Sequence, residues 1–235
     1  MLSVSETPAR SSISTTAVRR WAWATLVANT VIVLTGGLVR LTASGLGCPT
    51  WPQCTPGSFV PHRELGMHGA IEFGNRLLTY VLIAVVLGTV VAVWRWGGTS
   101  RSLRTHAVVI ALGIPLQGVV GGVTVLTDLN PWVVSFHLIL SMVLIALSAW
   151  LLFRVSGDRR VGASTTVRRL VALLGVLVAV AVYLGTVVTG SGPHAGDLDV
   201  PRNGLDPQLW SHVHAASVYA LVAVTAAVLW LARRT

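Results

Sequence analysis

Long apolar segments alternate with short polar ones along most of the chain. A helix needs roughly 20 residues to cross the hydrocarbon layer of a bilayer, which is about 30 Å thick. Within lipid the backbone must satisfy its own hydrogen bonds, so segments of this kind are expected to be helical. The pattern predicts six transmembrane helices, at residues 21–41, 70–94, 106–126, 131–153, 168–189 and 208–231.

The composition supports the same class of protein. Hydrophobic residues make up 53% of the 235 positions, charged residues make up 11%, and the mean hydropathy is +0.73. These values are too apolar for a soluble domain of this length. We therefore predict an all-α, polytopic membrane protein whose six transmembrane helices form a bundle.

The positions of the arginines predict the topology. All 17 cationic residues are Arg, and they follow the predicted spans, which favours a topology signal over a nucleic-acid partner for the net charge of +9. Cytoplasmic segments carry an excess of positive charge. Both termini are therefore predicted to be cytoplasmic, because thirteen arginines lie on their side of the membrane: Arg10, Arg19, Arg20, Arg95, Arg101, Arg104, Arg154, Arg159, Arg160, Arg168, Arg169, Arg233 and Arg234.

The predicted spans divide the chain into four parts. We expect a cytoplasmic tail at 1–20, a four-helix half at 21–153, a cytoplasmic linker at 154–167 and a two-helix second half at 168–235. The first span is too long for a signal peptide and is expected to be retained. The segments TGGLVRLTASGLGC and LGTVVTGSGPHAGD resemble each other, which indicates that the second half is a partial repeat of the first.

The only two cysteines, Cys48 and Cys54, lie in the first predicted outer loop. In a bacterial-type inner membrane this side faces an oxidising compartment, so a disulfide is the direct interpretation. It is either a structural link or a pair that is oxidised and reduced in service. A metal site is disfavoured because no further Cys or His lies beside the pair at ligand spacing.

Six of the seven histidines lie in or near the predicted outer half, and two of them lie inside spans. His137 and His214 are each six residues from the outer start of a span, which is about 9 Å deep at 1.5 Å per residue. Ionisable groups at such depth are rare and usually functional. One interpretation is a hydrogen bond to a neighbouring carbonyl, but two imidazoles at matched depth favour axial ligation of haem iron.

The second span carries a polar face. His68, Glu72, Asn75 and Thr79 follow one another at intervals of four, three and four residues, which places them on one side of a helix. Glu72 has two interpretations. It is the i,i+4 partner of Arg76, or it is a carboxylate near a reactive centre that transfers a proton.

Five motifs occur in order along residues 20–232: GGLVRLTASGLGCPTWPQC, IEFGNR, LQGVVGGVTVLTDLNPWVVSFHL, GTVVTGSGPHAGD and a span that opens with HA. Together they resemble the haem A synthase family. The resemblance implies a membrane oxidoreductase that oxidises the ring D methyl group of haem O to a formyl group, giving haem A for cytochrome oxidase. It also implies a substrate site with a His pair and a Glu in the first half, and a haem b held by another His pair in the second.

Carried over by position, the resemblance assigns Glu72 as the catalytic carboxylate and His137 and His214 as axial ligands of haem iron. It assigns Cys48 and Cys54 to a loop disulfide that influences activity. The expected cofactors are haem b and iron, with haem O as substrate. The expected partners are haem O synthase, a thiol–disulfide partner, an electron donor and membrane lipid, in the inner membrane of the cell.

Four further residues are expected to support the site: Arg40, Asn75, Arg76 and His194. Arg40 either meets a haem propionate or extends to the membrane interface. His194 either reaches a propionate or supports the fold of its loop.

Two departures from the family pattern are visible. Where the family commonly has Glu-x-x-His-Arg, this chain has EFGNR, so Asn75 stands in the place of a ligand. Either His137 alone holds the substrate haem, or His68 supplies the second ligand. Members usually have eight spans, and this chain shows six, so another copy of the chain or a separate protein is a candidate source of further helices. A haem-binding assembly factor and a b-type electron-transfer cytochrome, neither of them catalytic, are therefore kept as alternatives.

Overall fold

A computed structural model describes residues 13–157, 162 and 164–233 and confirms the prediction of a helical membrane bundle. The described residues form six long α-helices, each apolar enough to cross a membrane, and contain no β-strand. The helices are α1 (Thr15–Leu41), α2 (Gly66–Arg95), α3 (Arg101–Leu126), α4 (Pro131–Ser156), α5 (Thr165–Ser191) and α6 (Pro207–Ala232), with a short 3₁₀ helix, η1 (Arg63–Leu65), before α2. The chain is a multi-pass membrane protein.

Most helices begin earlier than the hydropathy pattern predicts, because polar residues cap them outside the apolar segment. The side chains of Ser14, Ser100, Ser164 and Asp206 each accept a hydrogen bond from a backbone N–H three residues later. Such caps satisfy N–H groups that have no partner within the helix. Hydropathy detects only the part of each helix that matches the hydrocarbon layer.

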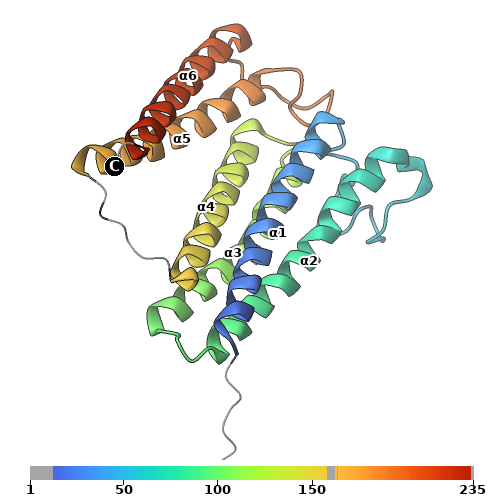
Figure 1. The fold of residues 1–235 in the computed structure, drawn as a ribbon. Coiled ribbons are helices and arrows are strands. Elements are labelled where there is room, and N and C mark those ends of the chain that lie inside the picture. Colours follow the sequence, from blue (N-terminus) through green and yellow to red (C-terminus); the bar gives the residue numbers. More distant parts are fainter. Residues whose placement is uncertain (1–12, 158–161, 163, 234–235) are drawn as a thin grey trace, which may run out of the picture.

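The first four helices form one bundle (Figure 1), in which α1 and α3 each pack against both α2 and α4. Its buried apolar core lies toward the end formed by the start of α1 and α3 and the end of α2 and α4, and includes Val18, Ala22, Val86, Val93, Ile110, Leu144, Leu151 and Val155. Polar side chains bond within this end too, since Thr25 and Thr89 hydroxyls lie 2.7 Å apart. The opposite half of the bundle carries most of the candidate site residues.

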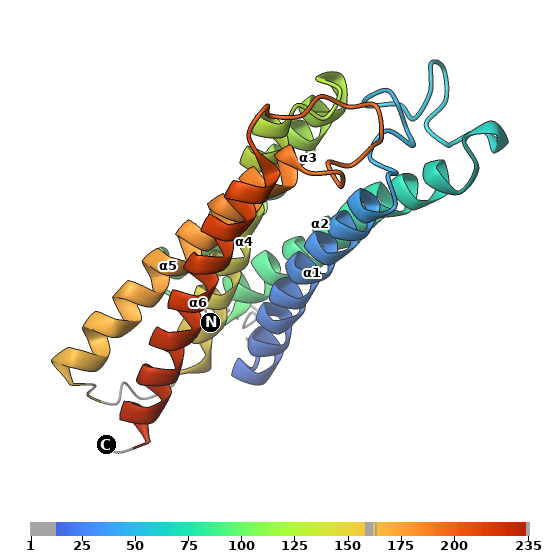
Figure 2. The ribbon, with the colours of Figure 1, turned by 90° about the horizontal axis from the view of Figure 1, so that it is seen from above.

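The last two helices lie beside α4. Helix α5 packs against α4 and α6, and among the described helices α6 contacts α5 alone and buries none of its residues. Figures 1 and 2 show this pair on one side of the four-helix bundle. The division into a four-helix half and a two-helix half remains a prediction about domains.

The three loops predicted to face outward lie at the same end of the molecule (Figure 1). Two of them are bonded to each other, because the Gly45 N–H donates to the Gly196 carbonyl at 2.9 Å. Parts of the predicted tail and linker, residues 1–12, 158–161 and 163, lie outside the described residues, together with Arg10, Arg159, Arg160 and Arg234.

Candidate functional site

A disulfide joins Cys48 and Cys54, as the sequence predicts. It closes the loop that connects α1 to α2, and both cysteines are buried. Four backbone groups of this loop form hydrogen bonds with side chains of α2: the N–H and carbonyl of Cys48 and the carbonyls of Thr50 and Gln53. The loop is therefore docked on the N-terminal part of α2.

Arg76 in α2 is the main anchor of this loop. Its Nη1 donates to the carbonyls of Thr50 and Gln53, at 3.0 and 3.3 Å, and its Nη2 donates to the carbonyl of Cys48 at 2.9 Å. Guanidinium presents several N–H donors in a fixed planar fork, which allows one side chain to bind several acceptors. The short peptide ring closed by the disulfide is thus bound through its backbone.

Glu72 lies between Arg76 and the loop and is only 6% exposed. Its Oε1 accepts from Arg76 Nε at 3.1 Å and from Nη2 at 2.5 Å, and its Oε2 accepts from the Cys48 N–H at 2.5 Å. The i,i+4 ion pair between Glu72 and Arg76, one of the two interpretations of Glu72, is present. Both carboxylate oxygens are used, so the structure places Glu72 in the support of the disulfide loop.

Two other polar residues on this face of α2, His68 and Asn75, bond to α1 and to the segment that follows it. His68 is exposed, and its Nδ1 lies 2.9 Å from the hydroxyl oxygen of Ser44. The Thr35 hydroxyl of α1 donates to Asn75 Oδ1 at 2.7 Å. The structure thus brings His68 and Glu72 to the same loop, but both His68 and Asn75 have protein partners.

Two adjacent glycines of α3 hold the loop and the candidate ligand His137 side by side. A Cβ on Gly122 would overlap the indole of Trp51, so the ring lies directly on the helix backbone. A Cβ on Gly121 would lie 3.2 Å from Cε1 of His137. These glycines were not among the predicted site residues, and their only signal in the sequence is the pair GG inside an apolar segment.

Substitution of Gly122 by alanine is expected to displace Trp51 and loosen the 48–54 loop. Overpacking of this kind costs about 1–3 kcal/mol, and it should appear as faster reduction of the disulfide by a soluble phosphine. Gly118→Ala is the matched control, since a Cβ there meets no atom within 4 Å. Equal reduction rates in the two variants would show that Trp51 does not hold the loop.

The ring of His137 forms no hydrogen bond within the described part of the chain, and its Nδ1 is buried without a partner. Gln117 of α3 instead bonds the backbone carbonyl of His137, at 3.1 Å, and the hydroxyl of Ser141, at 2.6 Å. The ring therefore does not form the hydrogen bond to a neighbouring carbonyl that the sequence also allowed. Both ring nitrogens of His137 are therefore free of hydrogen bonds to the described residues.

His214 in α6 has closely similar surroundings. Its Nδ1 is buried without a partner among the described residues, and a Cβ on Gly185 of α5 would lie 3.3 Å from its Cε1. It lines an open groove of about 470 Å³ between α4, α5 and α6. His212, two residues earlier on the same helix, is exposed.

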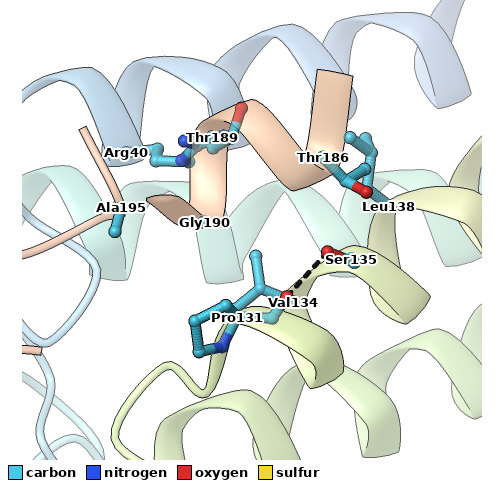
Figure 3. A pocket seen from close by; sticks show the side chains of 9 residues that line it. All are labelled: Arg40, Pro131, Val134, Ser135, Leu138, Thr186, Thr189, Gly190 and Ala195. Atoms are coloured by element: carbon cyan, nitrogen blue, oxygen red, sulfur yellow. Dashed lines mark hydrogen bonds between the residues drawn. The ribbon is translucent and has the colours of Figure 1, made fainter. Parts of the chain in front are cut away.

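Arg40 binds the loop that connects α5 to α6. Its guanidinium Nη2 donates to the backbone carbonyl of His194, and its Nε has no partner among the described residues. Figure 3 shows Arg40 beside a small pocket that Ser135, Thr186 and Gly190 also line. The pocket measures about 20 Å³, which suits roughly one water molecule, and the His194 side chain itself is exposed.

Comparison with known proteins places this arrangement in a family. The family described as Cytochrome oxidase assembly protein, COX15-CtaA, matches residues 19–69 and 64–196, which is well over half of the chain. The chain belongs to this family. The matched region contains the disulfide loop, Glu72 and His137, whereas α6 with His214 lies beyond it.

Curated relatives of this family member are named heme A synthase. The protein of Bradyrhizobium diazoefficiens is 30% identical over 209 residues, covering 74% of this chain and 57% of its own length. Those of Listeria welshimeri and Methylobacterium radiotolerans are both 28% identical, over 72% and 77% of this chain. The chain spans 57–58% of the length of these relatives. No solved structure matches it.

Proposed function

We propose that this protein is a haem A synthase, an oxidoreductase that oxidises the ring D methyl group of haem O to a formyl group. Membership of the cytochrome oxidase assembly family and the names of the relatives support the proposal. The structural observation that carries it is the pair of membrane-embedded imidazoles, His137 and His214, whose rings have no hydrogen-bond partner among the described residues.

The residues present fit haem. Each imidazole packs with its Cε1 edge against a glycine of a neighbouring helix and has a ring nitrogen without a hydrogen-bond partner among the described residues. The groove at His214 has a volume of about 470 Å³, within the range of small-molecule sites. Bound haem would supply the iron and the oxygen chemistry. His137 would hold substrate haem O in the first half and His214 a resident haem b in the second.

Glu72 and Arg76 serve the first of these sites through the disulfide loop. Glu72 binds the Cys48 N–H, the loop carries Trp51 to Gly122, and the adjacent Gly121 is the surface on which His137 rests. The family resemblance assigns Glu72 to proton transfer. A proton on Oε2 would weaken the acceptor that Cys48 uses, so we expect proton transfer at Glu72 to alter the loop contact.

We further propose that the chain lies in the inner membrane with both termini in the cytoplasm. The arginine distribution supports this orientation, which puts the Cys48–Cys54 disulfide on the oxidising side. Haem O synthase would deliver the substrate. An electron donor and a thiol–disulfide partner would complete the reaction cycle, and a second copy of the chain is a proposed partner.

A haem-binding assembly factor without catalysis is the second candidate. The observation that favours it lies in the first half, where Asn75 replaces a family histidine and is bonded to Thr35. His68, its candidate replacement, is bonded to Ser44. Among the histidines that lie within the described long helices of this half, His68, His106 and His137, only the ring of His137 has no hydrogen bond.

Haem analysis separates the two candidates. The 235-residue chain is produced in a host that makes haem O and lacks any other haem A synthase, and the extracted haems are separated by chromatography. We expect haem A together with haem O, and a return to haem O alone in the His137→Ala variant. Bound haem without haem A would favour the assembly factor, and a protein without haem would contradict both.

A further inference from the structure

We propose that the tip of the loop between α1 and α2, residues 54–61, inserts into the interface of the bilayer and anchors the disulfide loop there through Phe59 and Val60. The partner of this surface is phospholipid. The inference requires only that the chain spans a membrane, and it does not depend on haem.

The loop tip exposes large apolar side chains. Phe59 is 65% exposed and Val60 is 56% exposed, and neither belongs to a buried apolar cluster of the described residues. No residue of the tip is charged. Apolar surface of this kind is unfavourable in water, and a bilayer interface removes it from water without any protein partner.

The backbone of the loop tip suits a medium that is poor in water. Five of its N–H groups donate within the loop, those of Cys54, Thr55, Gly57, Ser58 and Val60. Pro56 and Pro61 carry no N–H, so the N–H of Phe59 is the only one in this described segment without a hydrogen bond. A backbone that enters lipid must satisfy its polar groups internally, and this segment nearly does so.

Contacts with α2 place the loop tip beside the N-terminal turns of that helix. A Cβ on Gly69 would lie 3.2 Å from Cβ of Pro61, so the chain after the tip folds back onto α2. Just before the tip, the Gln53 carbonyl accepts from Arg76 at 3.3 Å. Arg76 lies about 15 Å along the axis from Gly66, where α2 begins. In Figure 1 the loop before α2 lies beside the upper part of this helix, outside the four-helix bundle.

These turns of α2 lie at the level where the helix leaves the hydrocarbon layer. Helix α2 has 30 residues and is about 45 Å long, whereas the hydrocarbon layer is about 30 Å thick. Exposed or open positions recur along it at intervals of three and four residues, at Met67, Ala70, Gly74, Leu77 and Val81. Such intervals keep one face of a helix, so the lipid-facing surface of α2 reaches its first turn, and the loop tip packs at this level.

The residues that follow the tip suit the headgroup layer. His62, Arg63 and Glu64 are all exposed and come directly after Pro61. Aromatic side chains are favoured at membrane interfaces, and charged side chains remain in contact with water and headgroups. The order of an uncharged apolar tip followed by exposed charged residues therefore matches a segment that enters the interface and leaves it again.

The proposal is tested by spin labelling of the full chain in vesicles of phosphatidylcholine and phosphatidylglycerol. The two native cysteines are joined to each other, so a nitroxide reagent is directed to the thiol introduced by Phe59→Cys or, in a second variant, by Val60→Cys. Oxygen concentrates in lipid, whereas a nickel chelate stays in water. We expect the ratio of collisions with oxygen to collisions with the chelate to be several-fold higher at positions 59 and 60 than at a position in water.

Two matched positions calibrate the ratio. Asp199→Cys supplies the value in water, because Asp199 is exposed in the loop between α5 and α6. Val81→Cys supplies the value in lipid, because Val81 is exposed on α2 within the membrane. Ratios at 59 and 60 that equal the value at 199 would place the tip in water and overturn the proposal. Few collisions with either reagent would mean that protein covers the tip, which would overturn it in favour of a protein interface.

Discussion

Replacement of Arg76 by glutamine is expected to release the 48–54 loop and to lower the free energy of unfolding by about 3 kcal/mol, as when one partner of a buried ion pair is removed. The change takes the donors from three loop carbonyls, those of Cys48, Thr50 and Gln53, and leaves Glu72 with the Cys48 N–H alone. Glu72 is almost fully buried, so water replaces the lost donors poorly. Unfolding by SDS in mixed micelles measures the loss.

Two variants define the specificity of this effect. Arg63→Gln removes an exposed arginine from η1 and is expected to change the stability by less than about 0.5 kcal/mol. Glu72→Gln leaves Arg76 without its carboxylate and is expected to approach the effect of Arg76→Gln. If the Arg76 variant lost no more than the 0–1 kcal/mol typical of a surface ion pair, the anchoring role would be wrong.

Substitution of His137 or His214 by alanine is expected to remove one haem from the protein in each case. Losing a residue that merely supports a metal ligand costs roughly 10- to 100-fold in affinity, and losing the ligand itself should cost more. Haem content per chain, from the absorbance of the pyridine adduct, measures the result. His212→Ala is the control on α6, since this side chain is exposed and should leave the content unchanged.

The glycines beside these rings provide a milder version of the test. Gly185→Ala places a methyl group 3.3 Å from Cε1 of His214, so the imidazole must shift by a few tenths of an ångström. We expect a changed haem spectrum with the haem retained. Gly175→Ala, also within α5, meets no atom within 4 Å and controls for the gain in helix propensity. Identical spectra would mean that the Gly185 contact does not position His214.

The sequence alone was sufficient for the six transmembrane helices, because hydropathy over a window of about 20 residues is a local property. It was also sufficient for the Cys48–Cys54 pair, since arginine positions placed both cysteines in one short loop on the predicted outer side. Helical periodicity predicted that His68 and Glu72 share a face. The ends of the helices were missed where polar caps such as Ser14 extend them.

Only the tertiary structure decided which partners these residues meet. Periodicity indicates which face of a helix a residue occupies, but the neighbour on that face depends on how the helices pack. The small residues that permit close packing carry little sequence signal within an apolar helix. The positions of Trp51 on Gly122, of His137 on Gly121 and of Asn75 against Thr35 follow from such packing. The same holds for the groove beside His214, whose lining residues come from three helices, α4, α5 and α6.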